Sequence, residues 1–181
     1  MKRNQYTLGK PISFKGNGLH SGIPVTITMR PAPAGSGIIF RRIDLTGAPE
    51  VPAKSEFVTN TLRATTLERG DAKVFTVEHI LSALFALRID NCILEMDAPE
   101  PPVADGGALT FSQMILEAGI MELEEQTDIL TLETSVAVYE DNKFITALPY
   151  DGLRITFTSI NPHPLLGTQM KDFTIDKETY I

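Results

Sequence analysis

The chain has little of several residue types that define common protein classes. It carries one cysteine, Cys92, and no tryptophan among its 181 residues. A single cysteine excludes an intrachain disulfide and a zinc site built from cysteine pairs, and it favours a reducing, cytoplasmic setting. The formal net charge is −7 at pH 7, and no basic cluster interleaved with aromatic residues is present. Nucleic acid is therefore not expected as a partner.

Long apolar runs are absent as well. The basic N-terminus is not followed by the apolar stretch of a signal peptide. The apolar run after His79 is interrupted at Ser82 and Arg88, which leaves it far too short for a membrane span. With 43% hydrophobic residues, the sequence instead predicts a soluble globular protein of one or two domains.

The sequence is rich in strand-like alternation separated by glycine and proline turns. Within residues 5–30 the alternation is clearest in VTITM at residues 25–29, which is typical of a strand with one buried face. Residues 44–56 contain two prolines and are expected to be irregular. Further strands are predicted at residues 38–43 and 92–96, and a hairpin at residues 63–77 with its turn at residues 69–71.

Two amphipathic helices are predicted, one starting at Thr76 as its N-cap and one at residues 109–120. Spacing of apolar residues at i, i+3, i+4, i+7 and i+8 defines the buried face of the first helix. That face is predicted to consist of Val77, Ile80, Leu81, Leu84 and Phe85. On a helical wheel His79 falls roughly opposite, on the same side as the small residues Ala83 and Ala86.

The pattern of strands restarts after residue 126, which suggests a second domain. The charged stretch at residues 122–128 is expected to be a linker. Strand, turn and strand then follow in the order already seen at residues 25–43. The sequence therefore predicts a first α+β domain at residues 1–126 and the first strands of a second, incomplete α+β domain at residues 127–181. The strand-like runs of this second part are residues 129–141, 143–152 and 153–160.

Glu78 and His79 stand side by side in the first turn of the first helix. One interpretation is ordinary helix chemistry, because a carboxylate is stabilised at a helix N-terminus and exposed histidines are common. The other is a catalytic pair made of a general base and a metal ligand. The HExxH zinc motif is absent, and one histidine with one glutamate cannot complete a zinc site. The residues alone leave both interpretations open.

Several ordered motifs resemble one family, the zinc-dependent UDP-3-O-acyl-N-acetylglucosamine deacetylases of lipid A biosynthesis. The similarity runs from about residue 7 to the end of the chain. The segments that carry it are GNGLHSG (16–22), VTITMRPAPAGSGIIFRRID (25–44), TLRATTL (61–67), TVEHILSALFALRIDNCILEMDAPEPPVADGGA (76–108) and a His-Pro pair at 163–164.

The resemblance implies roles for particular residues. It makes Glu78 the general base and His79 a ligand of a zinc ion, in hydrolysis of the N-acetyl group of a UDP-sugar acyl substrate. It also suggests that His20, Leu62 and Ala64 bind the substrate. The alternatives are a plain loop histidine for His20 and ordinary strand residues for the other two. The implied fold is two similar sheet-plus-helices domains packed as a β-α-α-β sandwich.

One part of the family pattern is missing. The resemblance places two further zinc ligands on an HKxxD helix late in the second domain, and no such segment occurs in this chain. The remaining ligands are therefore expected beyond Ile181, and the chain as given is expected to be an inactive fragment unless another chain completes it. The alternative is a non-catalytic binding or scaffold module with the same fold. A truncated second domain would expose apolar strand residues such as Ile155 and Phe157, which predicts association through it.

Overall fold

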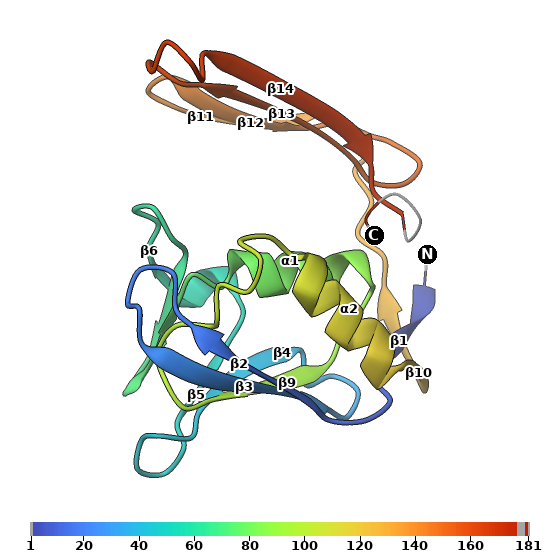
Figure 1. Ribbon diagram of the computed structural model, residues 1–181. Coiled ribbons are helices and arrows are strands. Elements are labelled where there is room, and N and C mark those ends of the chain that lie inside the picture. The colour runs from blue at the N-terminus through green and yellow to red at the C-terminus, as the bar shows by residue number, and fades with distance from the viewer. Residues whose placement is uncertain (1, 177–179, 181) are drawn as a thin grey trace. The chain divides into compact units, whose positions relative to one another are not determined.

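The computed structural model describes residues 2–176 and 180, and these divide into two units. The first unit spans Lys2–Thr127 and the second begins at Asp128. The described residues form mostly strands together with two α-helices, an arrangement compatible with the predicted α+β class (Figure 1). The β-α-α-β sandwich of two domains stays a prediction.

A five-stranded sheet with the order β2-β3-β9-β4-β5 is the base of the first unit. β9 pairs antiparallel with β3 and parallel with β4, so that Leu94 lies opposite both Met29 and Phe40. These three side chains are fully buried, as expected for alternating strands with one face on the core. The strands are β2 (Ile12–Asn17), β3 (Pro24–Pro31), β4 (Ile38–Arg42), β5 (Glu50–Pro52) and β9 (Cys92–Met96).

Two helices, α1 (Glu78–Ala86) and α2 (Leu109–Ala118), lie side by side over one face of this sheet (Figure 1). Their inner faces close the core, and each fully buried aliphatic or aromatic side chain contributes about 1.5–3 kcal/mol to folding. Within the described ranges, no helix is long and apolar enough to cross a lipid bilayer. The most deeply buried helix residues are Ile80, Ala83, Leu84, Phe111, Ser112 and Ile115.

The prediction of which face of α1 is buried is partly wrong. Phe85, expected in the core, is 68% exposed, whereas Ala83 and Ala86, expected on the outer side with His79, are buried. The reason is the second helix: α2 packs against α1 and covers a side that a wheel drawn for one helix leaves to solvent. The apolar surface of α1 is therefore rotated relative to the prediction.

A three-stranded sheet, β6-β7-β8, follows β5 in the chain. Its hairpin of β7 (Thr66–Arg69) and β8 (Ala72–Phe75) confirms the predicted turn, where Gly70 has a φ of +56°. β6 (Val58–Asn60) pairs with β7. The segment expected to be irregular at residues 44–56 instead contains β5 and the start of a 3₁₀ turn, Ser55–Phe57.

The prediction that the charged stretch at residues 122–128 is a linker is wrong. This stretch forms most of β10 (Ile120–Asp128), which pairs with β1 (Lys2–Leu8). Glu122 accepts hydrogen bonds from the side chains of Asn4 and Tyr6, the latter at 3.1 Å. β10 is mostly exposed, and polar contacts join it to β1, whose end at Leu8 is fully buried. The absence of hydrophobic alternation therefore concealed a strand.

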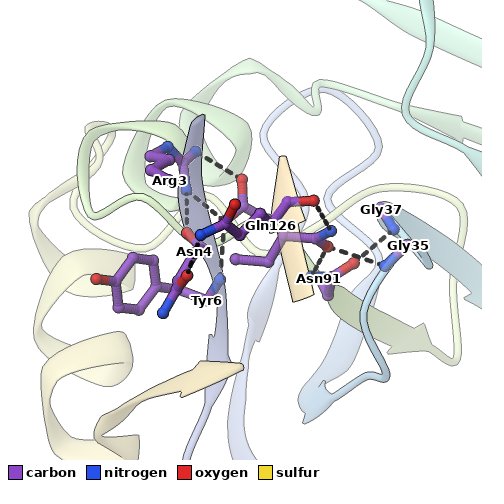
Figure 2. A network of polar contacts seen from close by, with 9 residues as sticks. Arg3, Asn4, Tyr6, Gly35, Gly37, Asn91 and Gln126 are labelled. Carbon is purple, nitrogen blue, oxygen red and sulfur yellow. Dashed lines mark hydrogen bonds and ion pairs between the residues drawn. The ribbon is translucent and has the colours of Figure 1, made fainter. Parts of the chain in front are cut away.

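A polar network fixes β1 to the rest of the first unit (Figure 2). The guanidinium of Arg3 donates to the carboxylate of Asp90 at 2.8 and 2.7 Å. Asn91 is 1% exposed, accepts from the backbone N–H of Gly37 at 3.0 Å and donates to Gln5 at 2.9 Å. These bonds connect β1 to the turn before β9 and to the start of β4.

The described residues of the second unit form two hairpins. Residues 129–135 are not part of a strand, and the strand β14 was not predicted. Ile155 and Phe157 expose 42% and 62% of their surface. Association through such faces stays a prediction. The strands are β11 (Val136–Glu140), β12 (Lys143–Ala147), β13 (Arg154–Ile160) and β14 (Thr168–Thr174).

Candidate active site

The first turn of α1 carries the predicted catalytic pair. Glu78 is the first residue of the helix and His79 the second, and both are half-buried. The N-cap position is occupied by Val77, which makes no capping bond through its side chain, so the prediction that Thr76 caps the helix is wrong. Thr76 has a φ of +57° and directs its hydroxyl elsewhere, to Glu100.

The carboxylate of Glu78 contacts a segment far from it along the chain. Its Oε2 atom accepts a hydrogen bond from the backbone N–H of Thr65 at 3.1 Å. Among the described residues, no hydrogen bond engages its Oε1 atom or the imidazole of His79. One carboxylate oxygen is thus held in place by the backbone of a distant segment, and the other is not.

The segment around Thr65 forms one wall of an open pocket of about 390 Å³. The three residues predicted to bind substrate, His20, Leu62 and Ala64, all line this pocket, Leu62 and Ala64 from this segment and His20 from the loop after β2. Leu62 is 79% exposed, so it presents an apolar side chain to anything that enters. His79 is not among the lining residues, and Glu78 is connected to the pocket through Thr65. The other lining residues are Arg63, Thr66 and Phe75.

Glu100 lies within the family-like segment 76–108, but no role was predicted for it. It lies in a proline-rich loop, yet it is only 1% exposed. Its carboxylate accepts hydrogen bonds from the backbone N–H groups of His20, at 3.0 Å, and Ser21, at 2.8 Å, and from the hydroxyl of Thr76, at 2.7 Å. Burial alone would raise the pKa of Glu100, but these hydrogen bonds outweigh burial and lower the pKa below its usual value. Glu100 therefore stays charged and connects the loop of His20 to the residue before α1.

The fit of a zinc ion to these residues is incomplete. In the part of the chain that the structure describes, no three histidine, cysteine, aspartate or glutamate side chains gather in a way that could hold a metal. The free imidazole of His79 suits one ligand position. Burial raises the pKa of the Cys92 thiol to about 12, so that it does not offer a thiolate. The described residues thus supply at most part of a zinc site.

Comparison with known proteins decides the family. Residues 5–181 match the family model described as UDP-3-O-acyl N-acetylglycosamine deacetylase. The chain belongs to this deacetylase family. The resemblance inferred from the motifs is thereby confirmed over nearly the whole chain.

Individual members of the deacetylase family agree with this assignment. The chain is 44% identical to a bifunctional enzyme LpxC/FabZ of Chlorobaculum tepidum, over 97% of the chain and 38% of that relative. It is 42% identical to a UDP-3-O-acyl-N-acetylglucosamine deacetylase of Legionella pneumophila, over 95% and 57%, and 43% identical to one of Myxococcus xanthus, over 93% and 54%. The chain therefore spans about half the length, or less, of these curated relatives.

Proposed function

We propose that the protein hydrolyses the N-acetyl group of UDP-3-O-acyl-N-acetylglucosamine, a step of lipid A biosynthesis that yields acetate and a free amine. The observation that carries this proposal is the hydrogen bond between the Glu78 carboxylate and the backbone N–H of Thr65, whose neighbours Ala64 and Thr66 line the pocket. This bond supports Glu78 as a candidate base near the pocket in a member of this deacetylase family. We further propose that the reaction takes place in the cytoplasm.

The chemistry assigned to this chain is a proton transfer at Glu78. A water molecule attacks the acetamide carbonyl carbon, and the Oε1 atom of Glu78 accepts the proton that the water loses. The bond between the carbonyl carbon and nitrogen then breaks, the nitrogen takes the proton that Glu78 received from the water, and the amine and acetic acid leave, the latter losing its proton to solvent as acetate. The hydrogen bond from Thr65 holds Oε2, so the carboxylate is oriented before the water arrives.

The pocket wall is proposed to bind the sugar and its substituents. Leu62 offers an exposed apolar surface, and Ala64 leaves room beside it because its side chain is small. His20 lines the pocket from a separate loop, whose backbone donates to Glu100. These features suit a substrate that combines polar hydroxyl groups with apolar atoms.

Zinc is part of this proposal as a cofactor, with His79 as one ligand and the other ligands outside the described residues. A bound zinc ion would act as a Lewis acid. Because the described residues do not complete such a site, the proposed steps concern the side chains of this chain alone.

The direct test is to incubate the intact protein with UDP-3-O-acyl-N-acetylglucosamine and to follow acetate and free amine. Release of both in equal amounts supports the proposal. Binding of the substrate without any release would contradict it and favour the alternative, a non-catalytic binding module. The control substrate is the same UDP-sugar with its N-acetyl group already removed, which must release no acetate.

A further inference from the structure

Glu100 is a buried charge that holds two separate parts of the candidate site. Its carboxylate is 1% exposed and receives donors from the His20–Ser21 backbone and from Thr76. These partners lie about 80 and 24 positions away in the sequence. In an interior of low dielectric, a carboxylate with too few donors is strongly destabilising, so each of these bonds constrains the segment that supplies it.

The loop that carries His20 is built around this carboxylate. A Cβ atom placed on Gly18 would lie 2.3 Å from Oε2 of Glu100 and 2.3 Å from the Ser21 hydroxyl, far inside van der Waals contact. Gly18 is therefore required for space, because the loop backbone approaches Glu100 too closely for a larger residue. The two backbone bonds to Glu100 hold the loop of His20 in this close approach.

The start of α1 is held by the same group. Thr76 is a β-branched residue with a φ of +57°. This left-handed conformation is less favourable than a right-handed one by about 1–2 kcal/mol for such a residue. It is 5% exposed, and its hydroxyl donates to Oε1 of Glu100 at 2.7 Å. The neighbouring backbone is also fixed, because the N–H of Phe75 donates to the carbonyl of Pro99 at 3.0 Å. Since Thr76 directs the chain from β8 into α1, its strained geometry sets the direction of the first helical turn.

We propose that Glu100 is a positioning residue of the candidate active site. Through Thr76 it orients the first turn of α1, so that Glu78 keeps its contact with Thr65, and through the His20–Ser21 backbone it holds the loop that carries His20. Its consequence for catalysis rests on the proposed function, whereas its effect on the positions of Glu78 and His20 does not.

The test compares Glu100→Gln with Glu95→Gln in the intact protein. Glutamine keeps the size of the side chain but turns an amide group toward donors. Glu95 is a matched control, because it is also largely shielded, with 14% side-chain exposure, but its partners are Arg30 and Arg41 on the sheet. The readouts are the backbone amide resonances of His20 and Glu78 by NMR, and kcat with KM.

The expected result for Glu100→Gln has two parts. The amide resonances of His20 and Glu78 shift, and kcat falls by about ten- to a hundredfold, as small misplacements of a catalytic group produce. Glu95→Gln leaves both amide resonances and kcat unchanged. A folded Glu100→Gln protein with wild-type kcat and an unmoved Glu78 resonance would overturn the inference.

Two variants of Thr76 separate positioning from general stability, including the case in which Glu100→Gln does not fold. Thr76→Val removes the hydroxyl while keeping the shape, and Thr76→Ser keeps the hydroxyl. The inference requires Thr76→Val to shift the Glu78 resonance and lower kcat, with Thr76→Ser close to the wild type in both. Equal behaviour of the two variants would overturn it.

Failure of the proposed function would look different. If the wild-type protein released no acetate, the deacetylase proposal would fall, and the NMR readout would still decide the role of Glu100. A Glu78 resonance that moves in Glu100→Gln supports positioning. A change confined to His20 and Ser21 contradicts it.

Discussion

Thr76 has a strained backbone and also makes a strong hydrogen bond. Replacing it shows which of the two contributes more to the free energy of unfolding. The left-handed backbone disfavours a β-branched residue by about 1–2 kcal/mol. The bond to the charged Glu100 carboxylate stabilises the fold by about 1.5–3 kcal/mol. Thr76→Val loses the bond and keeps the strain, so we expect it to lower the free energy of unfolding by about 1.5–3 kcal/mol.

Thr76→Gly also loses the bond, but glycine adopts the left-handed conformation without strain. Part of that gain is offset, because glycine makes the unfolded chain more flexible by about 0.5–1 kcal/mol. We therefore expect Thr76→Gly to lower the free energy of unfolding by about 1–2 kcal/mol, less than Thr76→Val. The predicted order of stability is wild type, then glycine, then valine.

The assay is urea unfolding followed by helical circular dichroism. Both α-helices of the described residues lie in the first unit, so the helical signal reports on the unit that contains Thr76. A glycine variant less stable than the valine variant would refute the claim that the backbone of Thr76 is strained. A glycine variant more stable than the wild type would show that the bond to Glu100 contributes less than the strain.

Three further predictions concern other parts of the chain. Asn91→Ala should lower the free energy of unfolding by about 1–3 kcal/mol in urea titrations, because it removes the bonds that the buried Asn91 side chain makes with the half-buried Gly37 and Gln5. Leu62→Ala should raise KM for the acylated substrate, while Leu116→Ala, which shortens an exposed leucine outside the pocket, should leave KM unchanged; equal effects would contradict the pocket assignment. The hydrogen bond from Arg154 lowers the pKa of Asp172 to about 2, so the stabilising ion pair is complete above about pH 4 and is lost as the pH falls toward 2. An NMR titration of the Asp172 carboxyl carbon with a midpoint near 4 would contradict this.

The elements that could be predicted from the sequence are those with local signals. The hairpin of β7 and β8 follows from two short strands around Gly70, and β3 follows from alternation of buried residues with others at 25–29. The buried face of α1 could not be derived in this way, because α2 covers it from a position about thirty residues later in the chain. β10 was missed because its bonds to β1 are polar and join residues more than 100 positions apart, whereas the end of β1 falls within the strand-like stretch 5–30.

Some residues of the candidate site could be predicted from the sequence, and others could not. Adjacent residues such as Glu78 and His79 stand out in the sequence, and family motifs drew attention to His20, Leu62 and Ala64, which the structure places in one pocket. Glu100 gave no local signal, because a glutamate among prolines is typical of an exposed loop. Its importance comes from burial and from partners on two distant segments, which only the folded chain brings together.

The central claim, that Glu78 acts as the base of a deacetylase, is tested most directly by the turnover of Glu78→Gln in the intact protein. Glutamine keeps an oxygen for the bond from Thr65 but cannot accept a proton. We predict that kcat for acetate release falls by about 10²–10⁴-fold while the variant still binds substrate, and that Glu117→Gln, on the exposed side of α2, keeps full turnover. Wild-type turnover in Glu78→Gln would contradict the account.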